Sequence, residues 1–305
     1  MIYTVTGKLS KTVLDKACVH EHICVVSNDM KQTFGNDWFD RERLISLASI
    51  VLKNAGFGLF VDGTPCDLGR DVRLLKRVSE QSGVKIVAST GFYYYPDLFT
   101  ENRTSEQLAA WILKECTDGM EGTGIKPGIL KCASHGNIIS NDSKKRLQAM
   151  AIVQKETELP MYVHCSHSGE VYEKIKLLIE SGAIPEKLII GHCGLNPDPD
   201  YLEVFLKKGC YISMDQNHCS PRKSEVSKSL TELCCRGYGG RICLSSDHCI
   251  YSDFTSEELT GIEKQPEEHV YMLNYQQNEI YSDFKGSDKD WRKMTGQNIV
   301  DILDM

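Results

Sequence analysis

Two histidines, His20 and His22, lie two positions apart inside an apolar run, ACVHEHICV (17–25). Because side chains alternate along a β-strand, both imidazoles point to the same side of a sheet and converge on one point. Imidazole is the commonest protein ligand for metal ions. The same spacing also suits a pair of hydrogen-bonded core histidines, so this segment alone leaves a metal site and a structural role open.

Four further polar residues each close a short apolar run elsewhere in the sequence. A charged or polar side chain in such a buried place is costly unless it is paired or bound to a metal. Six separately satisfied groups are a poorer explanation than one shared site, so we interpret the set as a metal centre. The four residues are Lys131 in GILKCAS, His164 in MYVHCS, His192 in LIIGHC and Asp247 in CLSSDHC.

The apolar runs that carry these residues alternate with amphipathic stretches such as DRERLISLASIVLKNAG and SKKRLQAMAIVQKETEL. Strands alternating with helices predict an α/β fold with a parallel sheet, and eight such units in about 250 residues predict a (β/α)8 TIM barrel. In that fold, catalytic groups lie at the carboxyl ends of the strands. The predicted strands are 17–25, 56–64, 84–90, 126–134, 160–166, 187–193, 209–215 and 241–247.

The whole chain, 1–305, is predicted to be a single domain, because no linker or low-complexity segment divides it. A doubly wound open sheet is the alternative, but no G-x-G-x-x-G segment follows the first strand. Segment 250–290 is polar and shows no clear strand. We expect it to form the eighth loop and helices that pack beneath the barrel.

The composition excludes several classes of partner. The formal net charge of -7 gives no basic field, so nucleic acid and anionic membrane surfaces are poor partners and a small-molecule substrate fits better. No run of about 18 apolar residues and no signal-peptide core occurs, which predicts a soluble, cytoplasmic protein. The thirteen cysteines form no C-x-x-C pair, so we expect reduced thiols in a reducing cytosol.

The ordered set of H-x-H, lysine, histidine, histidine and aspartate resembles the phosphotriesterase family of the amidohydrolase superfamily. Other stretches also stand where that family has similar ones: DGTPCDLGRD (62–71), VKIVASTGFYYYP (84–96), GIKPGILKCAS (124–134), IIGHC (189–193) and LSSDHC (244–249). Two stretches depart from it: the strand 7 loop DQNHCSPRKSE (215–225) and the segment after Asp247. The resemblance therefore specifies the centre better than the substrate.

The resemblance implies two divalent metal ions, with His20, His22 and Asp247 at the more buried one and His164 and His192 at the more exposed one. Lys131 would bridge both as N6-carboxylysine, since a free ammonium has no acceptor with which to ligate. Nitrogen and oxygen ligands suit Zn(II), although Mn(II), Co(II) and Ni(II) are alternatives. We expect a bridging hydroxide to attack the substrate while Asp247 accepts its proton.

Three residues are candidates for substrate contacts. Tyr93 follows strand 3 and matches a tyrosine that lies over the metals in relatives with lactonase activity, although an aromatic lid packed on its own loop would look the same. Arg222 and Lys223 in the strand 7 loop could grip a phosphate or a carboxylate, or could be solvated loop charges. Gly69-Arg70-Asp71 is better explained as a turn that starts a helix.

We therefore expect a hydrolase acting on a lactone or carboxylic ester, including a sugar lactone that bears phosphate. A phosphotriesterase acting on organophosphates is the alternative, because the same hydroxide would serve both reactions. A barrel that binds a ligand without turnover is a third hypothesis, and six complete ligands count against it. Lys131 also counts against mononuclear deaminases and TatD-like nucleases, which share the H-x-H barrel. A homodimer is expected from the resemblance alone.

Overall fold

The computed structural model describes residues 1–10, 14, 16–95, 97–134, 139–165, 168–254 and 261–304, with the side chains of all of these except 36 and 168–170. Its main sheet contains nine parallel strands within that part of the chain. Eight of them follow the chain in spatial order, and the ninth pairs with the first. The strands are β3 (Ala17–Val25), β4 (Leu59–Asp62), β5 (Lys85–Phe92), β6 (Ile129–Ala133), β7 (Met161–His164), β8 (Leu188–Ile190), β9 (Tyr211–Met214), β10 (Ile242–Leu244) and β11 (Cys249–Ser252).

The sheet closes on itself at the junction of β3 with the end of β10. The hydroxyl of Ser245 accepts hydrogen bonds from the main-chain N–H of Val19 (2.8 Å) and His20 (3.1 Å). The buried Glu21 carboxylate accepts the N–H groups of Ser246 (2.7 Å) and His248 (2.6 Å). The chain then continues into β11, which pairs with the second half of β3. A TIM-barrel-like α/β fold is therefore confirmed.

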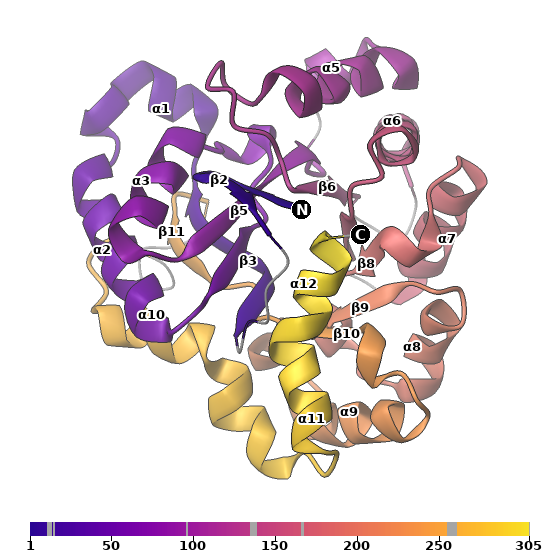
Figure 1. Cartoon of the computed structure of the whole chain (residues 1–305). Helices are drawn as coiled ribbons and strands as arrows, with labels where there is room; N and C mark the ends of the chain where they lie inside the picture. The colour runs from indigo at the N-terminus through magenta and orange to yellow at the C-terminus, as the bar shows by residue number, and fades with distance from the viewer. Residues whose placement is uncertain are drawn as a thin grey trace.

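Helices surround the barrel, as Figure 1 shows. Most begin at a side-chain cap, such as Asp40, Asp71 and Thr104, and two end at a left-handed glycine, Gly56 and Gly83. The helices are α1 (Asn28–Phe34), α2 (Arg41–Ala55), α3 (Val72–Ser82), α4 (Leu98–Glu101), α5 (Ser105–Asp118), α6 (Asn141–Thr157), α7 (Ser168–Glu180), α8 (Pro199–Leu206), α9 (Val226–Cys235), α10 (Pro266–Leu273), α11 (Asp288–Arg292) and α12 (Asn298–Leu303).

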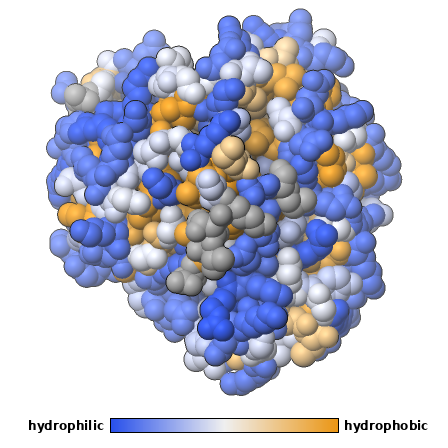
Figure 2. Space-filling model, in the orientation of Figure 1, coloured by the Kyte–Doolittle hydropathy of each residue, from blue (hydrophilic) through white to orange (hydrophobic). Residues whose placement is uncertain are grey.

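The inside of the barrel is filled by apolar side chains from successive strands, including Val19, Leu59, Val61 and Ile129. The last helix, α12, packs its apolar residues onto this cluster at the amino ends of the strands. Figure 1 looks at this end, with both chain termini near its centre. The visible surface is mostly hydrophilic, with apolar residues in small scattered groups (Figure 2). The opposite end of the barrel is thus left for the site.

The structure adds two features to the prediction. An antiparallel hairpin, β1 (Ile2–Thr4) and β2 (Gly7–Leu9), precedes the barrel. Segment 250–290 was expected to lack a strand, which is wrong at its start, because β11 runs to Ser252 and pairs with β3. The remainder of that segment contains α10 and α11, and residues 255–260 lie outside the described residues.

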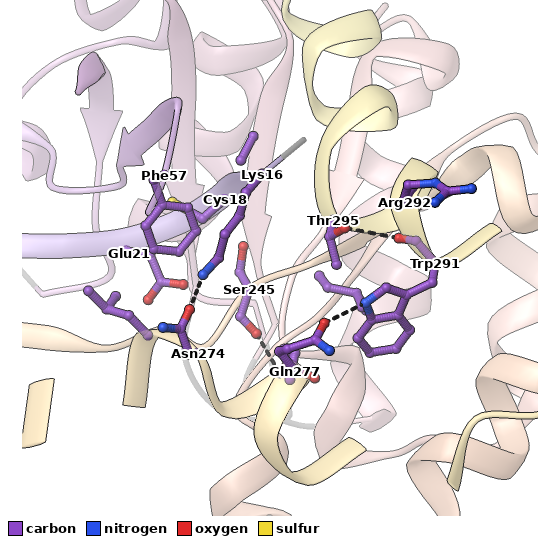
Figure 3. A pocket seen from close by; sticks show the side chains of 14 residues that line it. Lys16, Cys18, Glu21, Phe57, Ser245, Asn274, Gln277, Trp291, Arg292 and Thr295 are labelled. Atoms are coloured by element: carbon purple, nitrogen blue, oxygen red, sulfur yellow. Dashed lines mark hydrogen bonds between the residues drawn. The ribbon is translucent and has the colours of Figure 1, made fainter. Parts of the chain in front are cut away.

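A cavity of about 200 Å³ lies between the start of β3 and the C-terminal helices (Figure 3). We call it the lower cavity; its lining includes Lys16, Glu21, Asn274, Gln277 and Trp291. Lys16 donates to the carbonyl of Ala55 (2.6 Å) and to the Asn274 side chain, and Trp291 donates to Gln277 (2.9 Å). The Lys16 contact ties the C-terminal segment to the start of β3, and the Trp291 contact joins two C-terminal helices to each other. No helix among the described residues is long and apolar enough to cross a membrane.

Candidate metal centre

The register of β3 shifts between Cys18 and Glu21, where it pairs with β4. Ala17 and Val19 belong to the cluster inside the barrel, whereas Cys18 packs against the outer helices. Strict alternation would therefore place His20 and His22 on the outer side. The bulge re-aims the following residues so that both histidines face the interior at the carboxyl end of the barrel.

His20, His22 and Asp247 form one half of the centre. One ligand atom from each lies within 4.8 Å of the others. Asp247 Oδ1 is 3.0 Å from Nε2 of His20 and 3.4 Å from Nε2 of His22. The other ring nitrogen of His22, Nδ1, is 2.8 Å from the hydroxyl of Thr64, which leaves Nε2 to face the shared point.

His164 and His192 form the other half, with 2.8 Å between Nδ1 of His164 and Nε2 of His192. Behind them lies the fully buried Asp215, whose Oδ1 is 2.8 Å from Nδ1 of His192. Asp215 also accepts hydrogen bonds from the hydroxyls of Tyr162 (2.5 Å) and Ser213 (2.6 Å). This carboxylate fixes the His192 ring with Nε2 toward the centre.

Lys131 lies between the two halves at the end of β6 and is 1% exposed. Its Nζ is 3.0 Å from Nε2 of His20 and 4.4 Å from the centre of the Tyr162 ring. Among the described residues no carboxylate lies within 4.0 Å of this nitrogen. Burial lowers the pKa of Lys131 to about 8. A buried lysine with so little compensation fits a residue that becomes an anion between two cations.

The charge states of the neighbours suit metal binding. Burial, followed by the nearby Lys131, lowers the pKa of His20 to about 3, and burial together with His192 lowers that of His164. Both rings are therefore neutral and able to ligate. Burial acts to raise the pKa of Asp247, but His20 and His192 outweigh it and hold this pKa well below its ordinary value. All six predicted ligands thus meet at one place, five of them along one cavity.

Two glycines make room for this arrangement. A Cβ on Gly63 would lie 2.3 Å from Nδ1 of His20, and a Cβ on Gly191 would lie 2.4 Å from the Tyr162 ring. Real Cβ atoms do not approach so closely, so any larger residue would displace the rings. The glycines of DGT (62–64) and GHC (191–193) are explained by the site itself.

The backbone is left-handed two or three residues after the ends of three successive strands. His192 (φ 60°), Gln216 (φ 52°) and Asp247 (φ 56°) follow β8, β9 and β10, and they are three of the five described non-glycine residues with positive φ. L-residues adopt this conformation at a cost of about 1–2 kcal/mol each. Such strain is typical of functional sites and here turns the side chains of His192 and Asp247 inward. Gln216 then donates to Asp247 Oδ2 (2.5 Å).

The sequence matches the phosphotriesterase family over residues 1–285. The chain belongs to the phosphotriesterase family. Members of this family are binuclear metal enzymes, and the structure has a possible metal site at His20, His22 and Asp247. The protein is therefore a hydrolase that acts on ester bonds.

Two relatives illustrate the range of the family. The chain is 30% identical over 246 residues to an aryldialkylphosphatase of Saccharolobus solfataricus, covering 77% of each protein. It is 32% identical over 247 residues to an N-acetyltaurine hydrolase of Bos taurus, covering 70% of this chain and 71% of the relative. These names describe different bonds in the substrate.

Solved structures agree with the fold throughout. The phosphotriesterase from Mycobacterium tuberculosis superposes with a TM-score of 0.88 at 26% identity, covering 99% of this chain and 98% of the other. A mutant of a phosphotriesterase-like lactonase from Deinococcus radiodurans gives a TM-score of 0.83 at 25% identity, covering 99% and 100%.

The predicted substrate residues of this family member fall in two places. Tyr93 lies at the mouth, with its ring centre 5.2 Å from that of His164. It helps to line a cavity of about 300 Å³ that also borders five of the predicted metal ligands, which we call the mouth cavity. The cavity is lined by His20, His22, Val25, Leu68, Tyr93, Tyr94, Tyr95, Lys131, His164, Gln216, Asp247, Cys249, Ser252 and Phe254.

Arg222 and Lys223 are not among these lining residues. Arg222 is paired with Glu225, with 2.5 Å between Nη2 and Oε2, and also donates to Asn196 (2.9 Å). Their contact with substrate stays a prediction. The buried Arg70 pairs with Glu115 (2.6 Å) and Glu121 (3.0 Å), and Asp71 caps α3, so the G-R-D segment has the turn role expected of it.

Sequence reasoning missed the residues that orient the ligands. Asp215 closes the apolar run GCYISMD (209–215) just as Asp247 closes its own strand, and this shared pattern could have identified it. Tyr162 is an aromatic residue inside a strand, and the sequence alone cannot distinguish it from an ordinary core residue. Thr64 and Gln216 carry no local pattern at all.

Proposed function

We propose that this chain hydrolyses lactones, including sugar lactones that bear phosphate, at a binuclear centre. The observation that carries the choice of lactone is Tyr93, whose ring contacts the His164 side of the centre from the wall of the mouth cavity. A hydroxyl in that place can donate a hydrogen bond to the ring ester as it is attacked. The similarity to a lactonase structure supports the same choice.

The ligands divide as the geometry suggests. His20, His22 and Asp247 would hold one ion, His164 and His192 the other, and Lys131, as N6-carboxylysine, both. We propose Zn(II), because the donors are nitrogen and oxygen without thiolate. When bound, the ions supply acidity to a water molecule and polarise the oxygen of the scissile bond.

The protein's own groups do the remaining work. The Asp247 carboxylate, which faces both His20 and His22, accepts the proton that the attacking water loses. Asp215 keeps His192 fixed while charge develops. Burial of these groups keeps bulk water from the reacting atoms and strengthens every electrostatic contact.

A phosphotriesterase is the second candidate, favoured by the relationship to an aryldialkylphosphatase. The metal ligands cannot discriminate, because the same activated water serves both bonds. The N-acetyltaurine hydrolase relatives add amides to the substrates worth testing. A non-catalytic barrel is the least favoured reading, since all six ligands converge.

The test is a substrate panel on purified, metal-replete protein. We expect γ- and δ-lactones to be hydrolysed with the highest kcat/KM, ahead of aryl phosphotriesters and N-acyl amides. Turnover of phosphotriesters alone would make the lactone proposal wrong. Elemental analysis should give about two metal equivalents per chain, and fewer than one would contradict the binuclear centre.

Phosphate recognition can be tested separately. The double variant Arg222→Gln, Lys223→Gln should raise KM for phosphorylated lactones and leave KM for the unphosphorylated ones unchanged. Equal effects on both would exclude a phosphate grip at this loop.

We also propose that residues 1–305 act as one domain, as a cytoplasmic homodimer. All thirteen cysteines are free thiols, which supports a reducing compartment. Light scattering of the purified chain gives the mass, and cell fractionation gives the compartment. A monomeric mass would contradict the dimer.

A further inference from the structure

The three tyrosines at the mouth have no regular secondary structure to hold them. Tyr93, Tyr94 and Tyr95 follow β5 directly and form no helix or strand. Their rings nevertheless lie in a defined place, with Tyr93 5.2 Å and Tyr94 5.6 Å from the His164 ring, between centres. A segment placed so accurately needs contacts that fix its main chain.

One buried arginine supplies most of those contacts. Arg146, in the second turn of α6, is 2% exposed. Its Nη1 donates to the carbonyl oxygens of Tyr93 and Tyr95 (3.1 Å), and its Nη2 donates to that of Tyr94 (3.2 Å). Three consecutive carbonyl groups therefore meet one guanidinium, whose charge is balanced by Asp142 at 2.7 Å.

A second contact holds the start of the segment. Asp67, in the short helix Cys66–Leu68 that follows β4, accepts a hydrogen bond from the N–H of Tyr93 (2.7 Å). The segment is thus fixed at its N–H by the loop after β4 and at its carbonyls by α6. Neither Arg146 nor Asp67 lines the mouth cavity.

We propose that Arg146 is a positioning residue that holds the Tyr93–Tyr95 segment over the metal centre and so sets how tightly the substrate binds. This inference rests on the proposed function, in which Tyr93 contacts the substrate. A guanidinium suits the task because it offers five donors in a rigid plane, whereas the lysine ammonium is a point donor on a flexible stem. Lysine at position 146 would reach one or two of the carbonyls at most.

The first experiment measures the segment directly and needs no turnover. Amide hydrogen exchange is compared for the wild type, Arg146→Met and Arg146→Lys, in a peptide covering residues 89–95. We expect exchange about tenfold faster in Arg146→Met and an intermediate rate in Arg146→Lys. The matched control is Arg77→Met, which removes an exposed arginine paired with Glu42 on the outer helices. Unchanged exchange in Arg146→Met overturns the proposal.

The second experiment measures substrate binding. We expect Arg146→Met to raise KM for the preferred lactone about tenfold, with kcat within about threefold of wild type and an unchanged metal content. Guanidinium ion at non-denaturing concentration should restore part of the loss, because it can occupy the emptied place. Arg146→Met added to Tyr93→Ala should cost much less than Arg146→Met alone, since both act through one segment.

The outcomes separate the two proposals. A wild-type protein that hydrolyses nothing in the panel defeats the proposed function, while the exchange comparison still decides whether Arg146 holds the segment. A merely structural role would lower thermal stability and metal content together, without guanidinium rescue, and would give additive losses in the Tyr93→Ala background. That pattern overturns the positioning role.

Discussion

The mouth cavity and the lower cavity differ in the residues that line them. Three histidines, three tyrosines and an aspartate line the mouth cavity, whereas the lower cavity has three side-chain amides, a tryptophan and a threonine in its lining. In the lower cavity none of the buried polar atoms of the described lining residues lacks a hydrogen-bond partner, as the contacts in Figure 3 illustrate. The buried side-chain polar atoms of the residues that line the mouth cavity are likewise all paired. Native interiors pair nearly all of their polar groups, so both linings meet the usual standard, and the two cavities differ in which groups line them.

Lysine gives the sharpest contrast between the two cavities. Lys16 reaches a carbonyl, an amide and the Phe57 ring, whose centre is 4.5 Å from Nζ. Among the described residues, Lys131 Nζ contacts only the ring nitrogens of His20 and the Tyr162 ring. Lys16 therefore has a structural role, whereas Lys131 is placed for the proposed chemistry.

The largest effect is expected from Lys131→Ala. It removes the group that joins the two halves of the centre, so kcat/KM should fall about 10³-fold or more and bound metal should drop to one equivalent or less. A short carboxylic acid added in solution should restore part of both. Kinetics and elemental analysis give the answer, and full metal content in the variant would contradict the bridging role.

Lys16→Ala is the matched control for that variant. It removes the same side chain from the lower cavity, where the lost hydrogen bonds should cost about 1–3 kcal/mol of unfolding free energy. Activity should stay within about twofold of wild type, measured below the unfolding transition. Comparable loss of activity in both variants would break the distinction between the cavities.

Asp215→Asn should have the next largest effect. The neutral amide accepts the Nδ1–H of His192 more weakly than the carboxylate does, so metal binding at His164 and His192 should weaken about 10–100-fold. Competition with a chelator measures this affinity. Asp40→Asn, the same change at the cap of α2, should leave it unaltered, because asparagine also caps helices well.

Asp67→Asn should change the pH dependence of stability. Burial raises the pKa of Asp67 to about 6, above its ordinary value of 3.8. The folded protein therefore keeps this proton while the unfolded chain has lost it, so stability falls as pH rises from about 4 through 6. Asparagine does not titrate, so the variant lacks this loss of stability. Relative to wild type, its free energy of unfolding should therefore gain about 1–3 kcal/mol above pH 6. Urea unfolding at pH 4.5 and 7.5 tests it, and an equal difference at both pH values would contradict the shift.

Gln277→Ala should have the smallest effect. It removes one partly buried hydrogen bond, from Trp291, and should cost about 1 kcal/mol of unfolding free energy. Metal content and kcat/KM should not change. A measurable loss of metal would mean that the lower cavity communicates with the mouth.

Much of the centre could be predicted because it obeys a local rule: a polar residue closes an apolar strand. The rule located His164, His192 and Asp247 without any knowledge of contacts. The H-x-H spacing inside an apolar run located His20 and His22, although the bulge that turns them inward depends on pairing with β4 and could not be read from the sequence. Asp215 obeys the same rule and was overlooked.

The rest depends on contacts between distant segments. β11 is recognisable only through its pairing with β3, more than 220 residues earlier, because four residues of modest hydrophobicity predict nothing alone. Arg146 looks like an ordinary charged residue of an amphipathic helix, and its partners lie 51 to 53 positions away. Hydrophobic periodicity predicts which side of a helix or strand is buried. It does not predict which residues that side contacts.

The left-handed residues after β8, β9 and β10 have a consequence for engineering. Glycine adopts this conformation without the penalty that His192, Gln216 and Asp247 bear. A selection for heat resistance that ignores catalysis would be expected to enrich glycine at these positions. Such variants would lose activity while keeping the barrel fold. Gln216 is not a predicted ligand, so Gln216→Gly is the first of these substitutions to attempt.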